Sequence, residues 1–162
     1  MYTGVLERYD LKLLGKREMI LPYNTYRLTY HSKVDDMVQP ERINPELLRW
    51  ELHRVWVVEA TLKPGEHHRY GRRVFDVDED SWTALAADEY DLDGRLLSAV
   101  FALPTYDYQA GVPFTVLHVA YNFGTGAYFL PFFPGMNTGV RYIEPPSQRL
   151  WSPDSMAGQG VR

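Results

Sequence analysis

Closely spaced carboxylates between residues 76 and 80 are the first side chains in this sequence whose arrangement could do chemistry. Asp76-Val77-Asp78-Glu79-Asp80 begins like a calcium-binding loop, because alternating carboxylates can converge on a hard cation. The pattern fails further on, since Ser81 stands where the sharp turn needs glycine and Ala87 where the loop needs its bidentate glutamate. We therefore interpret this segment as a polar hairpin turn and expect no metal site in it.

The histidines offer imidazole nitrogens that could bind zinc or transfer protons. His67 and His68 are adjacent, so on a strand they point to opposite faces and cannot chelate one ion together. His31, His53 and His118 are far apart in the sequence, and a zinc site would require the fold to gather them. We expect no metal and no cofactor.

Carboxylates for acid–base catalysis are conceivable at Glu59 and at Asp88-Glu89. Ion pairing with Arg72 or Arg73 is the simpler interpretation, because a buried carboxylate needs a partner. The sequence has no cysteine, no Gly-x-Ser-x-Gly nucleophile motif and no glycine-rich phosphate loop. We therefore expect that the protein is not an enzyme.

Three successive antiparallel strands would position these side chains. Period-two alternation predicts strands at Leu52–Leu62, His68–Val77 and Trp82–Tyr90, the first of them rich in β-branched and aromatic residues. Lys63-Pro64-Gly65-Glu66 ends the first strand, since proline presets one corner of a turn and glycine supplies a positive φ. The dipeptide Asp93-Gly94 predicts a further hairpin after the third strand.

Downstream of this stretch, the pattern predicts strands at Arg95–Leu103, Phe114–Asn122 and Ala127–Phe133, with residues 104–113 as a loop. Both faces of the Arg95–Leu103 strand are largely apolar, so we expect it to be covered on both sides.

Upstream, the pattern predicts a strand at Tyr2–Leu14, a turn at residues 15–18 and a short strand at Thr25–Tyr30. Asn44 is a good N-cap and Pro45 suits the first helical position, which predicts a helix of about two turns. The fold class is therefore mainly β, a curved antiparallel sheet or half-open β-barrel with a few short helices.

Composition limits the classes of function. The chain has 162 residues, of which 45% are hydrophobic and 14% aromatic, as suits one globular domain built from sheets. Its formal charge of −4 argues against a nucleic-acid binder, because phosphate binding needs a concentrated positive field. The sequence contains no run of 18 apolar residues, so it predicts no membrane-spanning helix. The first residues do not have the pattern of a signal peptide.

Large apolar side chains on the predicted strands are numerous enough to line a groove as well as to fill a core. On a curved sheet with two apolar faces, we expect them to form a cavity for a hydrophobic ligand. The candidate lining residues are Trp56, Val58, Phe75, Trp82, Leu97, Phe101, Phe114 and Tyr121.

Several segments, taken in order, carry a family resemblance. RVWVVEATLKPGEHHRYGRRVFDVDEDSW and ADEYDLDGRL, with PYNTYRL and INPELLRWELHRVW upstream and SPDSMAGQGVR at the end, are similar to the C-terminal half of a bacterial family. This is domain-of-unknown-function family 1329, which is described as resembling outer-membrane lipoprotein-sorting proteins of the LolA/LolB-like superfamily. The resemblance extends over nearly the whole chain. It implies that residues 1–162 form a single domain, the C-terminal part of a larger LolA-like domain: a half-open β-barrel around helices, with an apolar concavity.

The resemblance also implies a location in the periplasm or at the periplasmic face of the outer membrane. We accordingly expect a non-enzymatic carrier or acceptor of hydrophobic cargo, with lipid or lipoprotein acyl chains and envelope transport proteins as its partners. The alternative is a structural or interaction module, accessory to a cell-envelope export complex, that docks through an exposed sheet edge. A hydrolase with an unrecognised site is a more distant alternative, and the family carries no established catalytic or binding motif.

Overall fold

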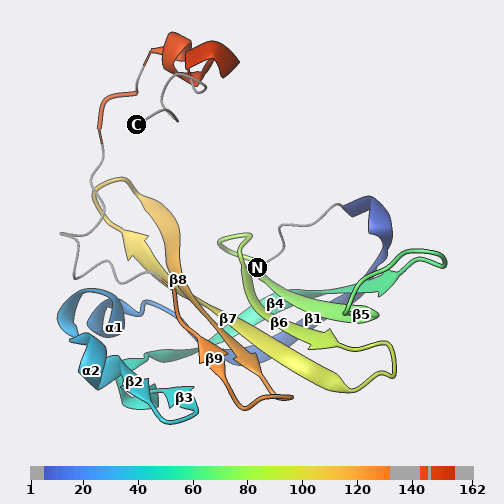
Figure 1. The fold of residues 1–162 in the computed structure, drawn as a ribbon. Coiled ribbons are helices and arrows are strands. Elements are labelled where there is room, and N and C mark those ends of the chain that lie inside the picture. The colour runs from blue at the N-terminus through green and yellow to red at the C-terminus, as the bar shows by residue number, and fades with distance from the viewer. Residues whose placement is uncertain (1–5, 132–142, 146, 156–162) are drawn as a thin grey trace.

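One seven-stranded antiparallel sheet dominates the computed structural model, which describes residues 6–131, 143–145 and 147–155 (Figure 1). The strand order is β1-β4-β5-β6-β7-β8-β9, and a separate hairpin is formed by β2 and β3. Within the described residues β1 and β9 do not pair with each other, so the sheet is open. The strands are β1 Tyr9–Pro22, β2 Val38–Gln39, β3 Arg42–Ile43, β4 Trp50–Leu62, β5 Arg72–Asp78, β6 Ala84–Tyr90, β7 Leu96–Asp107, β8 Val112–Asn122 and β9 Tyr128–Phe129.

The helices are all short. Those with defined bounds in the described part of the chain are η1 Leu6–Arg8, α1 Tyr26–His31, α2 Val34–Met37, η2 Pro45–Leu47 and η4 Gln148–Trp151. In the described part of the chain, none has the length and apolar character needed to cross a bilayer. The prediction of a mainly β fold, with an unclosed antiparallel sheet and a few short helices, is confirmed.

Alternation along β4 divides the sheet into two faces. Val55 and Val57 are buried on one side, which we call the inner face, while Trp56 and Val58 are half-buried on the opposite, outer face. Paired residues of neighbouring strands share a face, so Phe75, which pairs with Val58, belongs to the outer face.

The inner face is covered by the helices at its β7–β8 end. Figure 1 shows α1, α2 and the β2–β3 hairpin gathered beside β8 and β9. This arrangement buries an apolar cluster that joins the two layers and excludes water from the β7–β8 pairing. The cluster consists of Leu28, Met37, Ile43, Leu47, Leu103, Leu117 and Val119.

Strand β1 is longer than the sequence pattern indicates. The predicted turn at residues 15–18 is wrong, because these residues are part of β1. The strand pairs with β4 both before and after this segment. Gly15, at φ 128°, lies at a register shift between Leu13 and Gly15, so its positive φ serves a β-bulge and not a turn. Residues 1–5 of the predicted Tyr2–Leu14 strand lie outside the described residues.

The predicted strand at Thr25–Tyr30 is also wrong, since this segment forms α1. Asn24, at φ 49°, turns the chain out of the sheet, and the Thr25 backbone N–H then donates to the Pro104 carbonyl at 2.9 Å. Leu28 and Thr29 are adjacent and both fully buried, which a half-buried strand would not allow. Burial against the sheet overrides the local strand preference of the sequence.

The predicted loop at 104–113 is mostly sheet, because β7 continues to Asp107 and β8 begins at Val112. Pro104 has no backbone N–H to donate, but it lies at a register shift between Leu103 and Thr105, where a ladder hydrogen bond is not required. Its carbonyl is instead the acceptor that fixes the start of α1.

Two smaller predictions need correction. The cap at Asn44 is confirmed, since its Oδ1 accepts from the Glu46 N–H at 3.1 Å, but the helix is a single 3₁₀ turn because Leu48 is already extended. Trp82 is not part of a strand: it has φ 54° in the turn before β6, with 73% of its surface exposed.

The Leu117→Ala variant should lower the free energy of unfolding by about 2–5 kcal/mol, because Leu117 is fully buried between sheet and helices and its removal leaves a cavity. Urea unfolding measures the effect. Leu92→Ala is the matched control, since Leu92 is 72% exposed and the change should stay within about 0.5 kcal/mol. Equal effects of the two substitutions would contradict the packing described here.

Candidate functional site

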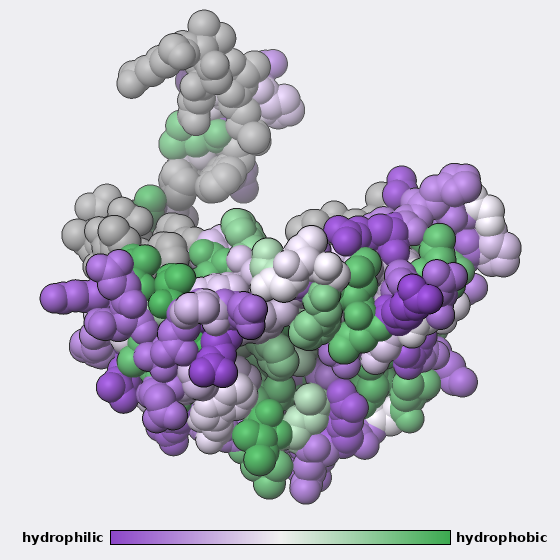
Figure 2. All heavy atoms as spheres, turned by 60° about the horizontal axis from the view of Figure 1, so that its bottom comes forward, coloured by the Kyte–Doolittle hydropathy of each residue, from purple (hydrophilic) through white to green (hydrophobic). Residues whose placement is uncertain are grey.

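An apolar pocket of about 140 Å³ opens between the helical cover and the inner face of the sheet. It lies where the end of β1, the β3–η2 segment and the start of β4 meet strands β7 and β8. Figure 2 shows hydrophobic residues gathered through the middle of the underside of the molecule, with hydrophilic residues on both flanks. The pocket is lined by Pro22, Arg42, Ile43, Pro45, Leu48, Trp50, Phe101, Leu103, Val119 and Tyr121.

Two of the predicted lining residues, Phe101 and Tyr121, meet in this pocket. Their rings lie edge to face with centroids 6.4 Å apart. Both are on the inner face. Strand pairing connects Val57 on β4 to Asp76, then to Ala86, Phe101 and Val119, and paired residues share a face. Tyr121 lies two residues after Val119 on β8 and therefore points to the same side.

The remaining predicted residues lie elsewhere. Trp56, Val58 and Phe75 share the outer face, and the ammonium of Lys16 lies 4.1 Å from the centroid of the Trp56 ring. Trp82 is exposed in its turn, as described above. Leu97 lies beside the β8–β9 turn, where its carbonyl accepts from the Phe123 N–H, and Phe114 pairs with Thr105 at the far end of β8.

The covering wall of the pocket is formed by residues that the sequence pattern does not single out. Arg42, Ile43, Pro45 and Leu48 come from a polar segment without periodicity and from the short turn capped by Asn44. The useful signal was the cap itself, because it fixes where the chain must return to the sheet. Trp50, the first residue of β4, follows this turn after two residues and also lines the pocket.

The hydroxyl of Tyr121 is the polar group at the covered end of the pocket. It accepts a hydrogen bond from the Ile43 N–H at 3.4 Å. Burial raises the pKa of Tyr121 above its ordinary value, and the nearby Arg42 charge acts in the opposite direction. Tyr121 is therefore neutral near pH 7 and has a proton to donate.

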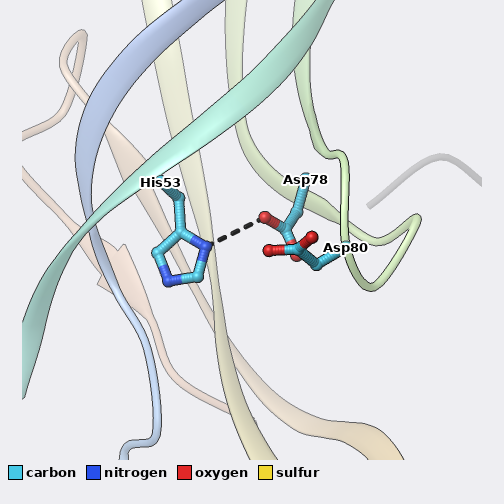
Figure 3. A group of neighbouring side chains, drawn as sticks. All are labelled: His53, Asp78 and Asp80. Atoms are coloured by element: carbon cyan, nitrogen blue, oxygen red, sulfur yellow. Dashed lines mark hydrogen bonds and ion pairs between the residues drawn. The ribbon is translucent and has the colours of Figure 1, made fainter.

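A second group of polar side chains brings His53, Asp78 and Asp80 together, with possible ligand atoms within 4.8 Å of one another (Figure 3). His53 Nδ1 lies 3.0 Å from Asp78 Oδ1, and the imidazole stacks on the Tyr23 ring with centroids 4.0 Å apart. Asp78 is fully buried and also accepts from the backbone N–H and hydroxyl of Ser81, at 2.9 and 2.6 Å.

These contacts decide what the group does. Imidazole and carboxylate are suitable donors for a divalent cation, but a cation would have to displace the His53 contact from Asp78. Asp78 instead closes the turn between β5 and β6 and joins it to β4, so the predicted polar hairpin turn at this position is confirmed. Within the described residues, His31 on α1 and His118 on β8 are not part of the group.

Ion pairs account for the carboxylates on the neighbouring strands. Arg72 Nε donates to Glu59 at 2.6 Å, and Arg73 Nε donates to Glu89 at 3.0 Å with both side chains buried. The expected pairing of these arginines with Glu59 and Glu89 is thus confirmed. Neither carboxylate is placed as a free acid or base.

Asp88 differs from these paired carboxylates. Burial on the inner face, followed by the nearby charge of Asp76, raises the pKa of Asp88 above its ordinary value, while Arg17 and Arg72 oppose the shift. Asp76 itself is held by a bidentate pair, with Arg17 Nε to Oδ1 at 3.0 Å and Nη2 to Oδ2 at 2.7 Å.

Fold and pocket together define a class of protein: an open antiparallel sheet whose inner face is partly covered by short helices and holds a small apolar pocket. Residues 1–157 match the family described as "Protein of unknown function (DUF1329)", and the chain belongs to this family. The resemblance read from the sequence is thereby confirmed.

The chain spans less than two fifths of the length of each of three similar proteins. Over 129 residues the chain is 44% identical to the uncharacterized protein PA3922 of Pseudomonas aeruginosa. The aligned residues make up 79% of this chain and 28% of PA3922. A crystal structure of a DUF1329 family protein from Desulfovibrio piger aligns with a TM-score of 0.48 and 19% identity, over 76% of this chain and 38% of that one. A putative outer membrane lipoprotein-sorting protein domain from Vibrio parahaemolyticus aligns with a TM-score of 0.46 and 15% identity, over 75% and 38%.

The Asp78→Ala variant should lower the free energy of unfolding by about 2–4 kcal/mol, because it leaves His53, Tyr23 and Ser81 without their buried acceptor. Asp80→Ala is the matched control, since Asp80 is exposed and its loss should change stability by less than about 0.5 kcal/mol. Chemical denaturation of both variants in a metal-free buffer provides the comparison. Equal losses would show that Asp78 has no special role in the turn.

The Asp88→Asn variant should stabilise the protein at pH 7. Because folding raises the pKa of Asp88, its stabilising contribution is complete below the unfolded pKa and is lost as the pH rises through the folded pKa. The gain from Asn should therefore shrink on acidification and vanish below about pH 4. Denaturation of variant and parent across pH 3–8 measures it, and a gain that grew on acidification would contradict the assignment.

Proposed function

We propose that this chain is part of a non-enzymatic carrier or acceptor of hydrophobic cargo in the cell envelope. The cargo is lipid, or the acyl chains of a lipoprotein, and the place of action is the periplasm or the periplasmic face of the outer membrane. The observation that carries the proposal is the apolar pocket between the inner face and its helical cover.

The pocket has the properties that binding an apolar guest needs. Its volume of about 140 Å³ is similar to that of an apolar protein cavity of about 150 Å³ that accepts benzene, so it holds about six carbon atoms. At about 0.8 kcal/mol for each buried methylene, six of them would contribute about 5 kcal/mol without any polar contact. Such a gain suits cargo that must be held and then released.

The mechanism is burial followed by transfer. An acyl chain leaves water for the pocket walls, and the open sheet lets it depart without breaking covalent bonds. Direction then comes from a partner whose own site binds the chain more favourably, because transfer follows the difference between two affinities. Envelope transport proteins are the class of partner that this mechanism requires.

A structural or docking module is the second candidate function, and the edge strand β1 favours it. β1 pairs on one side with β4, and its exposed apolar side chains are Leu11, Leu13, Leu14 and Ile20. A strand of another protein could add to such an edge through backbone hydrogen bonds. This reading predicts that substitutions in β1, and none in the pocket, abolish the interaction.

Native mass spectrometry of the chain purified without detergent from an exporting host, with organic extraction of what copurifies, tests the carrier proposal. A lipid or other apolar guest should be present in defined stoichiometry. Leu48→Trp should reduce its occupancy at least tenfold, because the larger side chain fills the pocket.

Two controls make the result specific. Leu92→Trp adds the same indole at an exposed turn and should keep the guest. Trp56→Asp changes the outer face and should also keep it, provided that the variant folds as judged by circular dichroism. A folded protein without any guest would favour the docking module, and loss of guest in Trp56→Asp alone would move the site to the outer face.

A further inference from the structure

The pocket has one polar end, and that end is cationic. Most of its lining is aliphatic, proline or aromatic, whereas Arg42 and the hydroxyl of Tyr121 supply the polar groups. An entirely apolar guest would form no hydrogen bond with either group. A guest with an apolar chain and an anionic head would match both parts of the site.

Arg42 is available for such a head group. Its Nε donates to the Gln39 side chain at 3.3 Å, and it forms no ion pair with a carboxylate of the described residues. The other arginines near the inner face are engaged, since Arg17 pairs with Asp76 and Arg72 with Glu59. Arg42 thus places at the rim of the pocket a charge that no carboxylate of the described residues compensates, whereas Arg27 on α1, which also lacks a carboxylate partner there, donates to the Glu46 carbonyl and is not part of the lining.

Tyr121 adds a directed hydrogen-bond donor next to this charge. Its oxygen accepts from the N–H of Ile43, the residue that follows Arg42, so the hydroxyl and the arginine lie at the same end of the pocket. Within the described residues, no acceptor takes the proton of the Tyr121 hydroxyl. A neutral tyrosine and a guanidinium side by side can bind the two oxygens of one carboxylate.

We propose that this pocket binds a single-chain carboxylate of about six to eight carbons, with the head group between Arg42 and Tyr121 and the chain against Phe101, Leu103 and Val119. This inference rests on the proposed function and adds the charge and the length of the guest. The volume admits about six carbon atoms of the chain, to which the carboxylate carbon at the rim is added, and the two donors at the rim favour a carboxylate as the head group.

The test compares octanoate with 1-octanol, which has the same chain length and no charge. Affinities are measured by following amide chemical shifts of the folded chain at pH 7 and low ionic strength. Octanoate should bind more tightly, although octanol is the more apolar of the two. Arg42→Gln should weaken octanoate binding about tenfold and leave octanol binding unchanged, and Tyr121→Phe should weaken octanoate binding several-fold.

Arg95→Gln is the matched control, because it removes the same charge from an exposed position in the β6–β7 turn and should leave octanoate binding unchanged. Equal binding of octanoate and octanol, or equal effects of Arg42→Gln and Arg95→Gln, would overturn the carboxylate assignment while leaving an apolar-guest site in place. Failure of both compounds to shift pocket amides such as that of Ile43 would remove the assignment and the carrier proposal together.

Discussion

The register of β4 between β1 and β5 decides which side chains meet inside this molecule. A slip by one residue would bring Trp56 and Val58 inward and expose Val55 and Val57. Two polar contacts oppose such a slip: Arg17 on β1 reaches across β4 to Asp76 on β5, and His53 on β4 contacts Asp78. The pocket depends on this register. Each strand from β5 to β8 is paired with the one before it, so the register of β4 determines the face on which Phe101 and Tyr121 lie.

The central strands were predictable because their side chains obey a simple period. β4 and β5 alternate between a more buried and a less buried face, β7 is apolar on both faces, and the turns between β4 and β8 contain Gly, Pro or Asp at positions that fix the reversal. The N-terminal segments were not predictable in the same way. Gly15 has the same sequence signature in a bulge as in a turn, and the helix α1 exists because Leu28 packs against Leu103 and Leu117 from a distant part of the chain.

For the same reason, only some of the residues that line the pocket could be predicted from the sequence. Phe101 and Tyr121 lie on strands whose alternation assigns them a face, so their inward direction could be inferred. Arg42 and Leu48 lie on short irregular segments, whose position is set by what they pack against. An aromatic residue such as Trp56 has the same composition signal as Phe101, and only the pairing of strands shows that the two lie on opposite faces.

The bulge at Gly15 has a consequence for how β1 could accept another strand. Backbone groups on either side of a bulge are out of step with each other, so one straight strand cannot satisfy both halves of this edge at once. An added strand could pair in register with either Tyr9–Leu13 or Gly15–Pro22, but not with both. Within the described residues, the edge that β1 offers to a further strand is therefore divided into two short segments with different hydrogen-bond phase.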